Sequence, residues 1–259
     1  MYKARANVLL FCGGCLKNAP IITNINCMPP LNYIAKSDIG MRPRQEDCFC
    51  VCKACGVLMA VVCDGLGGHS GGGVASDTVC QMAQKFFLNE PPAEKNAEGF
   101  FKNLIKKTNA ALVEIGRRTL TSPMTTVAIC LFFEKNAYFT HLGDSRLYIF
   151  EGDKMVFHTK DHTALQEKLD SLGVKSSRHS NVLTKCLGGH VGRSIEVSSA
   201  EIGENTLFVL CSDGFWDNLK TSEIARLRDF SLADKIFASA LQNGGAACDN
   251  ATFVAVKRA

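Results

Sequence analysis

Five short stretches that carry acidic side chains are the chemically most informative part of this 259-residue sequence. They are Arg42–Asp47, Asp64–His69, Gly143–Arg146, Ser212–Gly214 and Asp249–Asn250. Two of them follow the apolar runs Val57–Cys63 and Thr206–Cys211, and strand ends deliver side chains to a common rim. Aspartates beside glycines, without a histidine cluster, suit hard cations such as Mg²⁺ or Mn²⁺. Two such ions side by side are a known device for displacement at phosphorus.

The order of these stretches along the chain resembles that of the metal-dependent type 2C protein phosphatases. The matching blocks are Ser37–Arg42 with Glu46–Asp47, Val62–His69, Leu142–Arg146, Lys160–Thr163, Leu183–Gly188, Cys211–Asp217 and Asp249–Thr252. Together they cover nearly the whole chain, from about Ser37 to Val256. A single Asp-Gly dipeptide is more often a turn than a ligand, but seven blocks in family order favour the functional interpretation.

The hydrophobic pattern predicts strands in consecutive hairpins and helices in pairs. The predicted strands are 47–52, 57–63, 126–133, 137–142, 146–150, 206–211 and 251–256, and the predicted helices are 74–88, 97–117, 163–172, 221–227 and 231–241. Strands and helices do not alternate, which indicates an α+β domain with antiparallel sheets. The resemblance narrows this expectation to two central antiparallel β-sheets sandwiched between helix layers.

The chain divides into an N-terminal extension, residues 1–30, and an expected catalytic domain, residues 31–259. The extension has no clear period and ends in Pro29-Pro30. Its run Val8–Cys15 is also compatible with a short secretory segment, although no convincing cleavage site follows. The alternatives are a disordered extension and a translation start at Met28. We expect the extension to be non-catalytic.

Composition limits the partners and the compartment. Hydrophobic residues make up 46% of the chain, and the net charge of +4 is spread over scattered Lys and Arg residues, which does not indicate nucleic acid. No apolar run reaches the ~18 residues that span a bilayer. The 13 cysteines are odd in number and several lie inside apolar runs. Buried thiols of this kind indicate a reducing compartment, so we expect a cytoplasmic protein.

We assign seven candidate metal ligands within the acidic stretches. For the first ion they are Asp64 as the bridging ligand, the backbone carbonyl of Gly65, and Asp213 and Asp249; for the second ion they are Glu46 and Asp47, acting through bound waters. By resemblance, Asp144 joins a third, weaker metal position. The expected cofactors are therefore two Mn²⁺ or Mg²⁺ ions and a third at Asp144, which polarise the phosphate and lower the pKa of a shared water.

Arg42 is the candidate phosphate clamp, and with Asp64 it forms the expected catalytic pair. Its planar guanidinium can hold two phosphate oxygens at once, which a lysine cannot do. The acid that protonates the leaving group stays open, because Leu66 stands where some family members have a histidine. For His69 a structural role is favoured, and His162 is expected to shape the following flap, residues 162–181, rather than to act in catalysis.

The cysteines allow a second interpretation. Cys48, Cys50 and Cys52 alternate, so they share one face of a strand. Cys-x-x-Cys spacings occur at Cys12–Cys15 and Cys52–Cys55. A structural zinc site usually needs four ligands, and a paired second motif is not evident, so core packing is favoured.

The sequence therefore predicts a metal-dependent protein serine/threonine phosphatase that hydrolyses phosphoserine and phosphothreonine by direct attack of a metal-bridging water. Its expected partners are phosphorylated proteins, including a serine/threonine kinase or its targets. The alternative is a catalytically weak phosphatase-like domain that acts as a phosphoprotein-binding or regulatory scaffold. Retention of Asp47, Asp64, Asp213 and Asp249 favours the enzyme.

Overall fold

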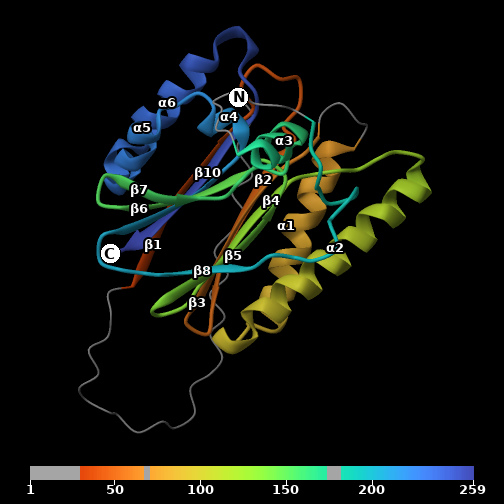
Figure 1. The fold of residues 1–259 in the computed structure, drawn as a ribbon, viewed down its shortest axis with the longest axis horizontal. Helices are drawn as coiled ribbons and strands as arrows, with labels where there is room; N and C mark the ends of the chain where they lie inside the picture. The colour runs from red at the N-terminus through yellow and green to blue at the C-terminus, as the bar shows by residue number, and fades with distance from the viewer. Residues whose placement is uncertain (1–29, 67–70, 174–181) are drawn as a thin grey trace, which may run out of the picture.

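The computed structural model describes residues 30–66, 71–173 and 182–259, which form two stacked five-stranded antiparallel sheets between helices (Figure 1). The first sheet has the order β1-β10-β9-β6-β7. Its strands are β1 Leu31–Asp38, β10 Ala251–Arg258, β9 Thr206–Cys211, β6 Arg146–Glu151 and β7 Lys154–His158. The second sheet has the order β2-β3-β4-β5-β8. Its strands are β2 Asp47–Ala54, β3 Val57–Asp64, β4 Val127–Phe132, β5 Asn136–Leu142 and β8 Ser198–Glu201.

Helices cover the outer face of each sheet. The long helices α1 (Gly72–Asn89) and α2 (Ala97–Thr119) lie on the second sheet, and α4 (Asp213–Trp216), α5 (Thr221–Ala225) and α6 (Ala233–Gly244) lie on the first (Figure 1). The short helix α3 (Ala164–Leu172) stands near the ends of the strands. None of the described helices is long and apolar enough to cross a membrane. The expected layered architecture is confirmed.

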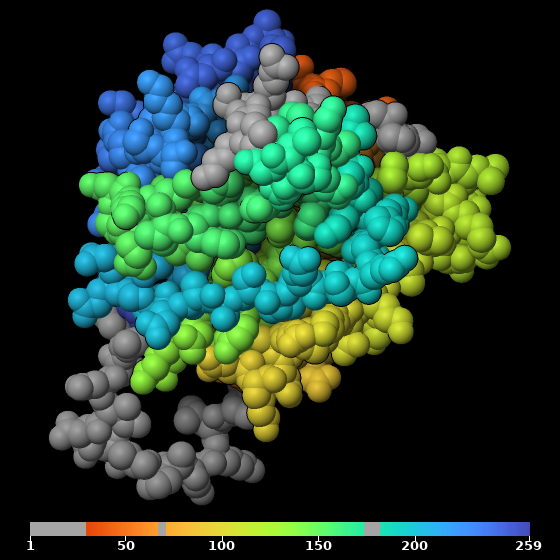
Figure 2. All heavy atoms as spheres, in the orientation of Figure 1, coloured from red at the N-terminus to blue at the C-terminus, as the bar shows by residue number. Residues whose placement is uncertain are grey.

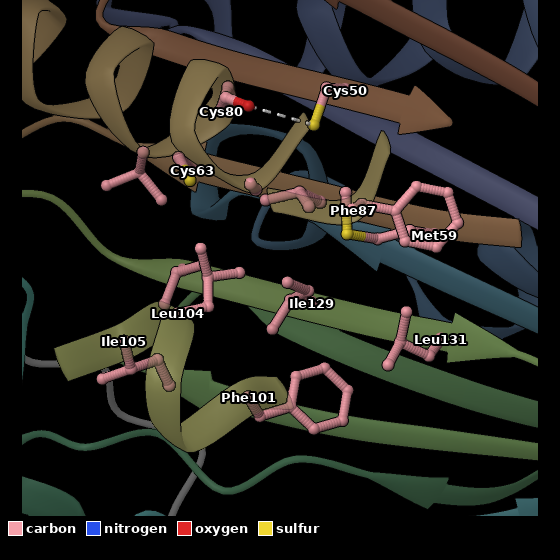
Figure 3. Close-up of a cluster of buried hydrophobic side chains, with 14 of the residues drawn as sticks. Cys50, Met59, Cys63, Cys80, Phe87, Phe101, Leu104, Ile105, Ile129 and Leu131 are labelled. Atoms are coloured by element: carbon pink, nitrogen blue, oxygen red, sulfur yellow. Dashed lines mark hydrogen bonds between the residues drawn. The ribbon is translucent and has the colours of Figure 1, made fainter. Parts of the chain in front are cut away.

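Alternation along the central strands explains why both sheet faces are buried. In β3, Leu58, Ala60 and Val62 belong to the core between the sheets. Met59 and Cys63 belong to the core under α1 and α2, together with the residues shown in Figure 3. A strand covered on both faces needs apolar residues at every position. The continuous apolar run before Asp64 therefore marks a central strand that holds this carboxylate at a fixed place.

The alternating cysteines of β2 lie on its helix-covered face, as predicted. Cys50 and Cys52 are buried in the core under α1 and α2, and Cys48 packs against the same core. The thiol of Cys50 contacts the backbone carbonyl of Cys80 on α1 at 3.6 Å. Cys55 is exposed in the turn that follows. These thiols fill space between sheet and helix as small apolar side chains do.

Three edge strands were not predicted from the sequence: β1, β7 and β8. All three lie at sheet edges and have half-exposed or exposed positions that lack an uninterrupted apolar run. Their strand state depends on distant partners; β1, for example, pairs with β10 along its whole length. The predicted helix 221–227 is also split, because α5 ends at Ala225 and a 3₁₀ turn, Arg226–Arg228, follows.

Candidate metal centre

The two aspartates of the second sheet lie opposite each other where β2 begins and β3 ends. Asp47 is the first residue of β2 and Asp64 is the last residue of β3, and the antiparallel register makes them direct partners. Like charges directly opposite each other on neighbouring strands are destabilising. This placement therefore costs stability unless a cation or a proton lies between the two carboxyl groups.

The first sheet brings three further aspartates to the same rim. Cys211 of β9 pairs with Arg146 of β6 and with Phe253 of β10, so these three strands come to the rim at one level. The carboxylates lie in the segments that flank these strand ends: Asp213 after β9, Asp144 before β6 and Asp249 before β10. The structure thus brings together four of the predicted sites, and Asp144 lies beside them.

Burial is the largest cause of the raised pKa values of the rim carboxyl groups, and neighbouring carboxylates add to it, while hydrogen bonds act in the opposite direction on the pKa of Asp47 and Asp213. Burial raises the pKa of Asp47 and Asp64 well above the ordinary value, and neighbouring carboxylates raise both further. The pKa of Asp213 is raised in the same way. Burial together with Asp213 and Asp161 raises the pKa of Asp144 to about 7. A bound cation would stabilise the ionised form of carboxyl groups whose pKa values are raised in this way. The cluster is therefore a candidate cation site.

The donor set fits a hard divalent cation. Oδ1 of Asp47 and Oδ1 of Asp213 are buried and have no hydrogen-bond partner among the described residues. Buried polar atoms without partners are rare, and a bound ion is one explanation for them. In the described part of the chain, however, no three acidic, histidine or cysteine side chains already surround a common point. Two of the aspartates, Asp47 and Asp249, instead have oxygens that contact side chains of the protein.

The second oxygen of Asp47 is held by the neighbouring sheet. Ser212 Oγ donates to Asp47 Oδ2 at 2.7 Å, and the same Oγ accepts the backbone N–H of Thr252 at 2.9 Å. Asp47 is therefore oriented by a bond across the two sheets. Its unpartnered oxygen remains for a ligand from outside the protein.

Asp249 is engaged by the candidate phosphate clamp. Arg42 Nη2 donates to Asp249 Oδ2 at 2.5 Å, and the two side chains are 52% and 38% exposed. The loop that carries Arg42 is fixed by Asn250, whose amide donates to the carbonyls of Ile39 and Arg44 and whose Oδ1 accepts the Glu46 N–H. The loop and the candidate ligand Asp249 are therefore held as one unit.

Gly65 and Glu46 meet at the start of α1. The Gly65 N–H donates to the Glu46 carbonyl at 3.1 Å, and a Cβ on Gly65 would overlap the backbone of Gly72. Close backbone packing, which the sequence interpretation did not foresee, thus requires glycine at position 65. The Glu46 carboxylate lies against Gly72 at the start of α1. Its assignment to the second ion stays a prediction.

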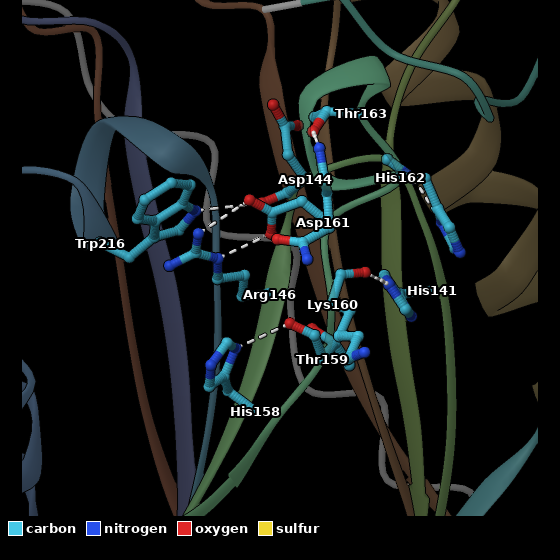
Figure 4. Close-up of polar contacts among 12 residues, drawn as sticks. His141, Asp144, Arg146, His158, Thr159, Lys160, Asp161, His162, Thr163 and Trp216 are labelled. Atoms are coloured by element: carbon cyan, nitrogen blue, oxygen red, sulfur yellow. Dashed lines mark hydrogen bonds and ion pairs between the residues drawn. The ribbon is translucent and has the colours of Figure 1, made fainter. Parts of the chain in front are cut away.

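The backbone of Asp144 is held by Trp216, which packs on the half-buried Arg146 (Figure 4). Arg146 forms two parallel bonds to Asp161, at 2.7 and 2.8 Å, and lies 3.3 Å from the centre of the Trp216 ring. Trp216 donates from its indole nitrogen to the Asp144 carbonyl at 3.1 Å. These contacts join β6, the segment after β7 and helix α4 beneath Asp144.

His162 stacks on His141 instead of facing the rim aspartates. The two rings are 4.4 Å apart and nearly parallel, and Nδ1 of His162 accepts the Gly143 N–H at 3.3 Å (Figure 4). Burial is the main cause that lowers the pKa of His162 to about 3, so the ring is neutral near pH 7. The position of His69 and part of the predicted flap, residues 174–181, lie outside the described residues.

Sequence reasoning missed several residues that orient the ligands. Besides Ser212 and Asn250, Thr126 accepts the Asp64 N–H on its side-chain oxygen at 3.0 Å, and its own N–H donates to the Asp64 carbonyl. Thr125 also donates to that carbonyl. The only available signal was the position of these hydroxyl and amide residues beside the motif blocks.

Two packed antiparallel sheets with helices outside and an acidic rim at one end define the architecture of a type 2C phosphatase. A family model described as Protein phosphatase 2C matches residues 40–248. The chain therefore belongs to the protein phosphatase 2C family. This confirms the resemblance inferred from the motif blocks.

Similar proteins agree with this classification. The chain is 29% identical over 238 residues to the serine/threonine protein phosphatase PstP of Mycobacterium tuberculosis (strain ATCC 25618 / H37Rv), covering 86% of this chain and 44% of PstP. It thus spans less than half the length of that curated relative. A crystal structure of a bacterial serine phosphatase is similar with a TM-score of 0.80 and 27% identity, covering 88% of this chain and 98% of that one. The catalytic domain of PstP in complex with two manganese ions is similar with a TM-score of 0.73 and 26% identity, covering 88% and 97%.

Proposed function

We propose that this protein is a metal-dependent protein serine/threonine phosphatase that uses two Mn²⁺ or Mg²⁺ ions, with a third position at Asp144. The observation that carries the proposal is the convergence of buried aspartates from both sheets, two of which have an unpartnered oxygen. The two manganese ions bound to the PstP catalytic domain support it. The substrates are phosphorylated proteins, including a kinase or its targets.

The residues of the chain divide the chemical work. Asp64, with Gly65, would hold the shared ligand position, flanked by Asp47 on one sheet and Asp213 on the other. When bound, the two ions supply neutralising charge for the phosphoryl group and an activated water for attack on phosphorus. Arg42, on the exposed side of the rim, would turn from Asp249 to the phosphate oxygens. His162 stacks on His141, and its Nδ1 accepts the Gly143 N–H, so the proposal leaves leaving-group protonation to water, to His69, which lies outside the described residues, or to no fixed group.

The test is replacement of two central ligands, Asp64→Asn and Asp213→Asn. Each variant is expected to lose about a hundredfold or more of the Mn²⁺-dependent turnover of a phosphothreonine peptide, because an amide cannot supply the charge that two cations need. Without metal, both variants are expected to be at least as stable as wild type, because one repelling carboxylate is gone. Turnover is measured with Mn²⁺, Mg²⁺, Zn²⁺ and EDTA, with circular dichroism on the same samples.

The matched control is Asp153→Asn, which makes the same change in an exposed turn and is expected to keep full activity. Near wild-type turnover by a folded Asp64→Asn or Asp213→Asn protein would disprove the assignment at that position. If the wild-type protein binds a phosphopeptide but does not hydrolyse it with either metal, the regulatory scaffold replaces the enzyme.

A further inference from the structure

A groove outside the metal centre lies between helix α2 and the segment 191–195, and it encloses about 410 Å³. Figure 2 shows the cyan segment that precedes β8 lying beside the yellow-green α2. Three of the lining side chains are cationic and three are aliphatic: Lys102, Lys106 and Arg193, and Ile105, Val191 and Ile195. We call this feature the α2 groove. No acidic residue is among the described residues that line it.

Two of the three cations in the α2 groove have no counter-ion. Lys102 pairs with Glu98 one turn earlier on α2. Lys106 and Arg193 are exposed, and neither has an ion pair or hydrogen bond with any described residue. Like charges that line one groove raise its potential and concentrate anions there. The electrostatics therefore select an acidic occupant.

The apolar part of the α2 groove selects a polypeptide. Ile105 is buried in the core, and Val191 and Ile195 are half-buried against it, so a shallow aliphatic floor lies between the cations. Nucleic acids usually bind on stacked aromatic side chains or along longer basic tracks, and no aromatic residue is among the described lining residues. An acidic segment with an aliphatic side chain matches both the aliphatic floor of the α2 groove and the cationic side chains around it.

The walls of the α2 groove are tied to the metal centre. Asn109, which also lines the groove, accepts the Gly188 N–H at 2.8 Å. The adjacent Leu187 exchanges two backbone hydrogen bonds with Thr125, whose hydroxyl donates to the Asp64 carbonyl. Lys185 lies against Gly192 at one end, and its positive charge lowers the pKa of His162 at the other, after the larger effect of burial. A peptide in the groove would therefore approach the rim along a basic path.

The chain's own N-terminal segment is a poor occupant. Residues 1–29 contain Lys3, Arg5 and Lys17 and no acidic residue, which gives this segment a charge of +3. Repulsion from Lys106 and Arg193 opposes its binding. The charge of this segment therefore does not complement that of the α2 groove.

We propose that the α2 groove docks an acidic segment of the protein substrate, next to the phosphorylated residue in sequence. This inference rests on the proposed phosphatase function and specifies the substrate class: phosphoproteins with Asp or Glu and an aliphatic residue near the phosphosite. Docking outside the metal centre raises the effective concentration of the phosphoresidue at the rim. It would lower KM for such substrates and leave small phosphate esters unaffected.

The test uses the full chain with Lys106→Glu and Arg193→Glu combined. The probe is a labelled, unphosphorylated Glu-rich peptide with one Leu, and its binding is measured by fluorescence anisotropy. It is expected to bind the wild type, and to bind the double variant about tenfold or more weakly, because two attractions become repulsions. The matched control combines Lys53→Glu and Lys95→Glu, the same charge change at exposed sites away from the groove, and should bind within about twofold of wild type. If the double variant does not fold, Lys106→Gln with Arg193→Gln replaces it.

Kinetics provide the second measurement. We expect the wild type and the control to have a higher kcat/KM for a phosphothreonine peptide with an acidic extension than for the same peptide without it. The double variant is expected to lose this difference. Turnover of para-nitrophenyl phosphate should stay unchanged. If neither the wild type nor any variant turns over any substrate, the proposed phosphatase function is wrong. The anisotropy measurement still tests whether the α2 groove binds an acidic peptide. Equal peptide binding by wild type and double variant, or displacement by an oligonucleotide but not by unlabelled peptide, would overturn the docking proposal.

Discussion

Arg42 has two competing partners at the metal rim. Its guanidinium donates to Asp249, which is also a candidate ligand of the first ion. A cation that takes the Asp249 carboxylate would release the arginine for phosphate. The ion pair is largely exposed, so it contributes little to stability. If Asp249 binds the first ion and Arg42 binds phosphate, as proposed, this ion pair would link metal binding to phosphate binding.

Replacement of Arg42 by lysine is expected to lower kcat/KM on a phosphopeptide about tenfold, because lysine keeps the charge but loses two-point binding of phosphate. Mn²⁺ affinity, measured by calorimetry, should be unchanged or slightly higher, because Asp249 loses its bidentate-capable partner. Arg44→Lys in the same exposed loop serves as the control and should behave as wild type. Unaltered kinetics in Arg42→Lys would make Arg42 an ordinary solvated loop residue.

His162 gives the protein an acid-sensitive element. Its pKa is about 3 in the folded state and near 6.5 when unfolded, so between these values the unfolded chain binds the extra proton. Stability is therefore fully present above pH ~6.5 and is lost as the pH falls toward 3. The slope for one group is at most ~1.4 kcal/mol per pH unit, and partial solvent exposure of the ring reduces it.

We expect His162→Asn to weaken the loss of stability between pH 6.5 and 4 by about 1 kcal/mol, measured by urea unfolding in EDTA. An asparagine oxygen can still accept the Gly143 N–H. The control is the exposed His190→Asn, which should keep the wild-type pH dependence. Parallel pH profiles for all three proteins would contradict the role given to the stacked pair.

Among the elements, the half-buried Arg146 joins β6, the segment after β7 and α4. The side chains of Arg146 and Asp161 are only 14% and 12% exposed, and the arginine also contacts Tyr148 and Trp216. Breaking a buried pair leaves an uncompensated charge or hydrogen bond, unlike the loss of a surface pair. The junction therefore sets how α4, which begins at Asp213, sits relative to Asp144.

Arg146→Lys is expected to destabilise the fold by about 2 kcal/mol, because the lysine keeps the charge but loses the parallel bonds and the stacking on Trp216. Chemical denaturation measures this change. Arg118→Lys makes the same replacement in an exposed pair with Glu114 on α2 and should cost less than about 0.5 kcal/mol. Equal losses at the two positions would show that burial of the Arg146 pair has no special effect.

In the whole molecule, the two sheets bring together candidate ligands and the residues that orient them, although these are far apart in sequence. The bond from Ser212 to Asp47 joins residues 165 positions apart, and the bond from the Glu46 N–H to Asn250 joins residues 204 apart. β1 closes the first sheet by pairing with β10 from Leu31 onward. The first described strand therefore already belongs to the packed first sheet.

Removal of residues 1–27, leaving Met28 as the first residue, is expected to shift the thermal midpoint by no more than about 2 °C and to keep peptide turnover. The reason is that the first strand and every motif block lie after the cut. A second truncation that removes β1 as well should lower stability severely, because the backbone groups of β10 lose their partners. A large loss in the shorter truncation would show that the first residues pack on the domain.

The sequence by itself determined the family, the order of the motif blocks, the central strands and the candidate ligands on them. These features depend on local information: apolar runs such as that before Asp64 report burial, and turn residues mark strand ends. Only the tertiary structure decided the edge strand β1, the contact of Glu46 with the start of α1 and the orienting roles of Ser212 and Asn250. An edge strand has no burial pattern of its own, and an orienting hydrogen bond depends on a partner hundreds of positions away. Such choices are made by packing of the two sheets, which no local window of residues contains.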